Sequence, residues 1–126
     1  MSKQIINTTA APAPIGPYSQ SVKANGFLFI SGQIAIDPHT GNVEAKTVEE
    51  EALQVMKNLE AVLKEAGLGF SAVVKTTIFL TDMSLFSQVN DVYASFFEDA
   101  FPSRETIAVK GLPRGVQVEI SMVAVA

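Results

Sequence analysis

The sequence predicts an α+β fold in which two helices pack on one face of a mixed β-sheet. Short apolar runs typical of strands alternate with two longer segments whose apolar residues recur at helical spacing. The predicted order along the chain is β-β-β-α-β-α-β-β, which is typical of a two-layer sandwich. The chain of 126 residues has the length of one domain, residues 1–126, and 48% of its residues are hydrophobic, enough to form a core.

The first part of the chain predicts three strands. A short strand over residues 4–7 is followed by a proline-rich loop, which Ile15 and Tyr18 are expected to anchor. Two strand-like runs then flank Asn25-Gly26, a strong hairpin signal because a type I′ turn requires positive φ at both central residues. At the end of the third strand, Gly32 indicates either a plain bulge or a close approach of a ligand to the backbone.

Both predicted helices carry start signals and a single apolar stripe. The first covers residues 48–66, because Thr47 and Glu50 form a capping box and Gly67 favours a helix end. The second is expected to be capped by Ser84 and to stop before Pro102. The inward-facing residues of the two helices are Ala52, Val55, Met56, Leu59, Val62, Leu63 and Ala66, and then Leu85, Val89, Val92, Tyr93, Phe96 and Phe97.

The other face of the sheet is predicted to be apolar and uncovered. Residues 27–30, 78–80 and the C-terminal strand are apolar on both faces, yet both helices lie on one side. A monomer would expose a large apolar patch, which indicates association. We therefore expect an obligate oligomer that packs sheet against sheet.

Residues 101–120 are predicted to form a β-hairpin that carries two opposite charges. If its turn is centred on Gly111-Leu112, Arg104 falls opposite Glu119. Charges among apolar strand residues are costly unless they are paired or used. The spacing alone leaves two interpretations open, a structural salt bridge and a functional site.

Composition excludes several classes of function. The chain has no cysteine, which removes thiolate nucleophiles and Cys-ligated zinc, and its one histidine, His39, lies in a turn sequence. The net charge of -4 and the lack of a Lys/Arg run oppose a polyanion-binding role. Neither a signal peptide nor an apolar run of membrane-spanning length is apparent, so the expected location is the cytoplasm.

Several motifs, in order along nearly the whole chain, resemble those of the RidA (YjgF) family of reactive intermediate/imine deaminases. The segments that carry the resemblance are Ile15-Gly16-Pro17-Tyr18-Ser19-Gln20, Ile30-Ser31-Gly32-Gln33, Val74-Lys75-Thr76-Thr77, Val89-Asn90-Asp91-Val92-Tyr93, Phe101-Pro102-Ser103-Arg104 and Val118-Glu119-Ile120.

The resemblance implies a chorismate-mutase-like fold assembled as a homotrimer, with a barrel-like core and clefts between neighbouring subunits. It also implies hydrolysis of reactive enamines and imines, such as 2-aminoacrylate, to 2-keto acids and ammonia. In family terms this is a 2-iminobutanoate/2-iminopropanoate deaminase. The implied partner is a small imino or keto acid; no cofactor, metal, nucleic acid or membrane is implied.

The resemblance assigns the chemistry to Arg104 and Glu119. Arg104 matches the family's arginine, whose planar guanidinium can bind the substrate carboxylate in a bidentate manner. Glu119 matches the family's glutamate, which acts as a general acid/base through water. Apolar surroundings would raise the pKa of Glu119 and a nearby Arg104 would lower it, and the sequence does not decide between the two effects.

The same resemblance implies that Tyr18, Ser31, Gly32, Asn90 and Thr106 also bind the substrate. Three of these also have a structural interpretation: Tyr18 as a loop anchor, Ser31 as a bonded strand hydroxyl, and Asn90 as a helix-surface residue. Gly32 would let backbone amides approach the ligand. Thr106 stands where many family members have cysteine, which excludes thiol chemistry, although its backbone amide can still hold a carboxylate.

Two other functions remain open from the sequence. The same clefts could bind metabolites without catalysis, as in a regulatory protein. Cleavage of single-stranded RNA is the third possibility, but it requires a basic surface that follows phosphates, and the net charge of -4 argues against it.

Overall fold

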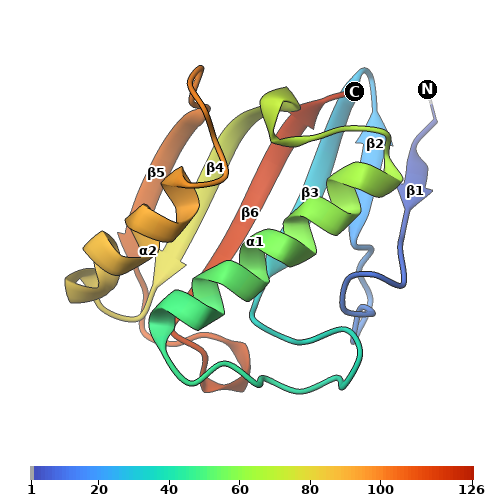
Figure 1. Cartoon of the computed structure of the whole chain (residues 1–126). Helices are drawn as coiled ribbons and strands as arrows, with labels where there is room; N and C mark the ends of the chain where they lie inside the picture. The colour runs from blue at the N-terminus through green and yellow to red at the C-terminus, as the bar shows by residue number, and fades with distance from the viewer. Residues whose placement is uncertain (1) are drawn as a thin grey trace.

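A computed structural model describes residues 2–126 and has two layers, a six-stranded mixed sheet with two helices on one face (Figure 1). The strand order is β1-β2-β3-β6-β4-β5. The elements are β1 (Gln4–Ile6), β2 (Ser21–Ala24), β3 (Phe27–Gln33), α1 (Val48–Glu65), β4 (Val73–Leu80), α2 (Phe86–Ala94), β5 (Ser103–Ala108) and β6 (Val118–Val125), with short 3-10 helices η1 (Phe70–Ala72), η2 (Met83–Leu85) and η3 (Pro113–Gly115). The predicted fold class and element order are confirmed. Neither α1 nor α2 has the length and apolarity that crossing a membrane requires.

The turn between β2 and β3 is the one that the sequence predicts. Asn25 and Gly26 have φ angles of 53° and 81°, so both occupy the left-handed region. The two strands pair antiparallel from Ser21↔Ile30 to Ala24↔Phe27. The right-handed twist of the strands favours this type of turn, and few residues other than asparagine and glycine accept it.

Helix α1 begins as predicted and ends one residue earlier. The Thr47 hydroxyl accepts a hydrogen bond from the Glu50 amide at 3.1 Å. The Glu50 carboxylate accepts in turn from the amide of Lys46, one residue before the expected partner. At the other end Gly67 has a φ of 76°, which lets the Leu68 amide donate back to the Leu63 carbonyl.

The predicted start of the second helix is wrong. Asp82, rather than Ser84, caps this segment, because its carboxylate accepts from the Ser84 amide at 2.8 Å. A single 3-10 turn, η2, follows, and α2 begins only at Phe86. Aspartate is as good a cap as serine, and here it stands two residues after the end of β4, where the chain must turn.

The predicted hairpin of residues 101–120 is also wrong. Strand β5 pairs with β4 in parallel, and β6 lies between β3 and β4. Arg104 therefore lies opposite Thr76, and Glu119 lies opposite Phe79. The central position suits β6, because its alternate residues Val118, Ile120, Met122 and Ala124 are fully buried, whereas β5 is mostly exposed and forms an edge.

The sheet face opposite the helices is apolar and open to solvent in the single chain. Phe29 and Val125 are each 48% exposed, and Phe27 and Ile107 are exposed to a similar degree. By contrast, the helix-facing side chains of β3, β4 and β6 are buried under α1 and α2. The predicted uncovered apolar face is confirmed.

The loop between β1 and β2 is held by Gln20 rather than by the expected anchors. Ile15 and Tyr18 are 77% and 52% exposed, so the prediction that they anchor the loop is wrong. The Gln20 side chain, 1% exposed, accepts from the Thr8 amide at 2.7 Å and donates to the carbonyls of Thr8 and Pro12, both at 2.9 Å. The buried side-chain amide of Gln20 thus pairs with backbone groups of this loop, in which the prolines have no N–H to donate.

We expect Gln20→Leu to lower the free energy of unfolding by about 2–4 kcal/mol, because buried carbonyl and amide groups lose their partners. Urea unfolding of the two proteins measures this difference. Gln88→Leu, at an exposed position of α2, is the matched control and should change stability little. Equal stability of the two variants would contradict the role of Gln20.

Candidate functional site

The predicted site residues form two groups that lie on different parts of the molecule. Tyr18, Gly32 and Glu119 line a cavity of about 350 Å³ between the proline-rich loop, the end of β3 and η3. Asn90 and Arg104 line a second cavity of about 400 Å³ between α2 and β5. The single chain therefore does not bring the predicted site residues together in one cavity.

Glu119 lies against the backbone of Gly32. The pairing of β3 with β6 shifts register between Ile30 and Gln33, so the bulge predicted at this glycine is confirmed. A Cβ placed on Gly32 would overlap the Glu119 carboxylate, with its carboxyl carbon at 2.9 Å. The close approach that the glycine allows is made by the protein's own carboxylate.

The surroundings of Glu119 favour its protonated form. Burial raises the pKa of its carboxyl above the ordinary value of 4.5. No salt bridge to this carboxylate occurs within residues 2–126. Of the two opposing effects on this pKa, desolvation therefore dominates in the single chain, and a carboxyl with a raised pKa is better suited to donating a proton than an ordinary one.

The other predicted residues near Glu119, Ser31 and Tyr18, differ in how available their side chains are to a ligand. The hydroxyl of Ser31 donates to the Ser19 carbonyl at 2.6 Å, so its structural interpretation as a bonded strand hydroxyl fits the geometry. The Tyr18 ring is more than half exposed at the cavity wall. Apolar side chains of Ile15, Ile34 and Ile36 line much of the rest.

In the second group, three residues of α2 hold the guanidinium of Arg104. Arg104 Nη1 donates to Asn90 Oδ1 at 2.7 Å. Its Cζ lies 5.4 Å from the centre of the Phe86 ring and 5.2 Å from that of Tyr93. The helix-surface interpretation of Asn90 is therefore incomplete, since its amide is bonded to Arg104. A guanidinium fixed in this way is suited to binding a carboxylate.

Thr106 follows Arg104 on the same face of β5, since residues two apart on a strand point the same way. Its hydroxyl oxygen is buried, and it is the only buried side-chain nitrogen or oxygen among the described residues without a hydrogen-bond partner. An unpaired buried hydroxyl is a cost that folding must offset.

Arg104 and Glu119 lie on opposite faces of the sheet. Arg104 pairs with Thr76 of β4 and Glu119 with Phe79, which is three residues further along the strand. Side chains an odd number of residues apart point to opposite faces. Arg104 accordingly contacts the helix layer, whereas Glu119 lies on the open face.

The sequence analysis missed the roles of Phe86, Tyr93 and Arg114. From the sequence, Tyr93 is assigned only to the core and Phe86 to neither core nor site, although their spacing of seven residues, with Asn90 between them, indicates a common helix face. Arg114 lines the Glu119 cavity and has a φ of 61°. A left-handed arginine cannot be read from composition, but Leu-Pro-Arg-Gly is a turn signal that could have drawn notice.

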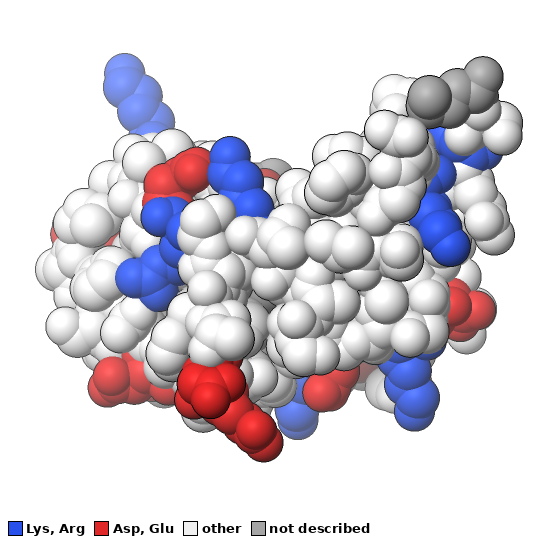
Figure 2. Space-filling model, turned by 90° about the horizontal axis from the view of Figure 1, so that it is seen from above, with Lys and Arg blue, Asp and Glu red and all other residues white. Residues whose placement is uncertain are grey.

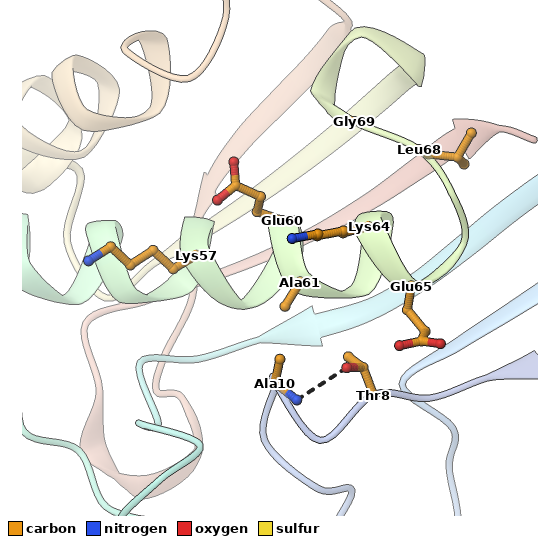
Figure 3. Close-up of a pocket in the computed structure, with 9 residues that line it drawn as sticks. All are labelled: Thr8, Ala10, Lys57, Glu60, Ala61, Lys64, Glu65, Leu68 and Gly69. Carbon is orange, nitrogen blue, oxygen red and sulfur yellow. Dashed lines mark hydrogen bonds between the residues drawn. The ribbon is translucent and has the colours of Figure 1, made fainter.

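The largest groove lies elsewhere, on the outer side of α1 near the start of the chain (Figure 3). Its volume is about 830 Å³, and its lining includes Lys57, Glu60, Lys64 and Glu65 of α1 together with Thr8 and Ala10. Figure 3 shows Glu65 pointing toward Thr8 and Glu60 pointing away from it. It contains none of the predicted site residues. Over residues 2–126 there is also no cluster of three histidine, aspartate or glutamate side chains that could hold a metal ion.

The fold and the two cavities define a small α+β protein with a guanidinium held by helix α2 and a half-buried carboxyl acid. Its sequence matches the model of the family described as Endoribonuclease L-PSP over residues 8–126. The chain belongs to this family, which is the RidA family that its motifs resemble.

Characterised relatives and solved structures support the assignment. A RutC family protein from Synechocystis is 52% identical over 99% of this chain and 98% of its own. The mouse protein named 2-iminobutanoate/2-iminopropanoate deaminase is 47% identical, over 98% of this chain and 91% of its own. The crystal structure of YyfA from Yersinia pestis, described as a member of the conserved Rid protein family, superposes with a TM-score of 0.97 at 47% identity, covering 99% of this chain and 100% of the other.

The raised pKa of Glu119 predicts how stability depends on pH. Between the ordinary pKa of 4.5 and the higher value in the fold, the folded protein binds more protons at Glu119 than the unfolded chain does, so this residue's contribution falls as pH rises. Glu119→Gln lacks this dependence. We expect the stability of the variant relative to the wild type to increase as pH rises through this window and then to level off. Urea unfolding at a series of pH values tests this, and a constant or falling difference would contradict it.

Gly32→Ala should displace the Glu119 side chain without unfolding the protein. The overlapping atoms belong to the end of a flexible side chain, which can move into solvent. We expect the thermal midpoint to change little and the pKa of Glu119, followed by NMR of its side-chain carboxyl carbon, to move down toward its ordinary value. Gly111→Ala, where an added Cβ meets nothing within 4 Å, is the control. An unchanged Glu119 titration in Gly32→Ala would show that the close approach does not set this pKa.

Proposed function

We propose that this protein is an enzyme that hydrolyses reactive 2-imino acids and their enamine tautomers to 2-keto acids and ammonia, as a 2-iminobutanoate/2-iminopropanoate deaminase. The observation that carries the proposal is the combination of a fixed Arg104 guanidinium with a Glu119 carboxyl of raised pKa. The name of the mouse relative supports the same reaction class. We propose also that the whole chain, residues 1–126, forms a single RidA-like domain.

Arg104 binds the substrate carboxylate in this mechanism. Asn90 occupies Nη1, and within residues 2–126 the remaining guanidinium nitrogens have no hydrogen-bond partner. Nε and Nη2 therefore form the edge that is free to pair with both oxygens of a carboxylate. The Thr106 amide, and Tyr18 and Ser31 with Gly32, complete the ligand's surroundings as the family resemblance implies.

Glu119 acts as the general acid/base. Protonated Glu119 donates to the imine nitrogen, and the resulting carboxylate takes a proton from the water that attacks the imine carbon. The tetrahedral carbinolamine then loses ammonia after a further proton transfer to nitrogen, which leaves the 2-keto acid. Water addition forms a C–O bond, loss of ammonia breaks the C–N bond, and the hydroxyl proton of the carbinolamine returns to Glu119. The reaction is a hydrolysis with no net oxidation or reduction, so no redox partner is needed.

We propose further that each working cleft is formed by two chains. Since Arg104 and Glu119 lie on opposite faces of one sheet, they can face the same substrate only if they come from different subunits. The exposed apolar face offers the surface for assembly, and covering half-exposed side chains such as Phe29 contributes about 1 kcal/mol each. A closed homotrimer, as the resemblance implies, would give every chain the same two neighbours.

The alternatives differ in what they require of the surface. RNA cleavage needs a continuous basic track, but basic and acidic side chains are interspersed on the face that Figure 2 shows, and the net charge is -4. A metabolite binder needs Arg104 but no acid. Glu119→Ala should therefore retain ligand binding and lose turnover if the protein is an enzyme.

The test generates 2-aminoacrylate with a serine/threonine dehydratase and follows keto-acid release with and without this protein. We expect acceleration by the wild type, loss in Glu119→Ala, and a rise in KM of at least about tenfold in Arg104→Ala. Arg104→Lys keeps the charge but not the bidentate geometry and should stay impaired. If an assembled wild type gives no acceleration while it binds 2-keto acids, the enzyme proposal fails and the binder remains.

Mixed assemblies test whether the cleft is shared. Arg104→Ala and Glu119→Ala subunits, unfolded and refolded together in equal amounts, give clefts with the intact Arg104 of one chain and the intact Glu119 of the other. Random mixing should restore about a quarter of wild-type activity in a cyclic assembly. The two variants refolded separately are the controls. No gain on mixing would mean that both residues of a cleft come from one chain.

A further inference from the structure

The contacts of Tyr93 extend beyond the Arg104 side chain to the strand beneath it. The Tyr93 hydroxyl donates to Thr76 Oγ1 at 3.0 Å, in a bond buried from solvent. Thr76 is 0% exposed and lies on β4 directly opposite Arg104 on β5. The ring that packs on the guanidinium is thus bonded to the residue paired with that arginine.

The three α2 residues around Arg104, which we call the α2 stripe (Phe86, Asn90 and Tyr93), recur at four and three residues and so share one helix face. Phe86 and Tyr93 each place a ring within 5.5 Å of the guanidinium carbon, and Asn90 accepts from Nη1. Arg104 itself belongs to an exposed edge strand, whose side chains would otherwise be mobile.

Among the described residues of the α2 stripe, only Tyr93 has a polar bond to a sheet residue other than Arg104. Asn90 bonds to the arginine alone, and Phe86 has no polar atom. Tyr93 also packs on Phe97, with the two ring centres 4.9 Å apart. Its ring is therefore held both by this packing and by the hydrogen bond of its hydroxyl. A fixed ring fixes the plane in which the guanidinium can lie, because stacked and cation–π geometries depend on that plane.

We propose that Tyr93 and Thr76 are positioning residues that pre-organise Arg104 for a carboxylate ligand. The inference rests on the proposed function, because it concerns the same carboxylate site. Neither residue needs to touch the substrate. Their hydrogen bond holds the ring, the ring holds the guanidinium, and the free Nε–Nη2 edge is presented without the entropic cost of ordering a flexible arginine on binding.

Hydroxyl deletions test this directly. Tyr93→Phe keeps the ring and removes the bond, and Thr76→Val removes the same bond from the other side. Thr76→Ser restores a hydroxyl at that position. Ser95→Ala, which deletes a hydroxyl at the end of α2 that bonds only to the Val92 carbonyl, is the matched control.

The measurement compares a carboxylate ligand with its neutral counterpart. Calorimetry gives the affinity for 2-oxobutanoate and for its methyl ester in the assembled protein. We expect Tyr93→Phe and Thr76→Val each to weaken 2-oxobutanoate binding about three- to tenfold, with the ester changed less than about twofold. The double variant should be no weaker than either single one, since both remove one interaction. Thr76→Ser and Ser95→Ala should bind as the wild type does.

Turnover separates this inference from the proposed function. In the imine assay the two deletions should raise KM by the same factor and leave kcat nearly unchanged. If the wild type shows no turnover but the deletions selectively weaken 2-oxobutanoate, the enzyme proposal fails and the positioning role stands. The positioning role is overturned if the deletions leave 2-oxobutanoate affinity unchanged, if they weaken acid and ester equally as general loosening would, or if the wild type binds no 2-keto acid.

Discussion

The rest of the molecule depends on one constraint, the alternation of core-facing and open-face side chains along strand β6. This strand lies between β3 and β4 (Figure 1). One set of its side chains is buried in the core beneath α1 and α2, and the other set lies on the open face. Glu119 belongs to the second set. Any shift of one residue in register would put its carboxyl into the core and apolar residues such as Ile120 outside, so burial fixes the position of the acid.

Burial also sets the chemistry of that acid. Gly32 leaves just enough space at the bulge of β3 for the Glu119 carboxylate to lie against backbone, away from much of the solvent. Within residues 2–126 no salt bridge offsets the cost of desolvating this carboxyl. Sites that retain such a cost are typically functional, because the altered pKa is what the chemistry uses.

The side chain of Arg104 is held in position in a different way. Strand β5 is an exposed edge of the sheet. The side chain of Arg104 is held by its contacts with α2 and, through the Tyr93 ring, by the hydrogen bond between Tyr93 and Thr76. Acid and arginine thus occupy opposite faces of one sheet, each pre-organised by its own surroundings. In the proposed function each residue supplies half of the working site, and association through the apolar face joins the two halves.

The fold class, the order of the elements, the Asn25-Gly26 turn, the uncovered apolar face and the family could be predicted from the sequence, because periodicity, turn chemistry and motifs are local signals. The tertiary structure alone decided that β6 lies in the centre and β5 at the edge, which replaced the expected hairpin. It also decided that Gln20 holds the proline-rich loop and that Arg104 and Glu119 face opposite ways. Strand order depends on which apolar faces can be buried together across the whole chain, and no local pattern contains that information.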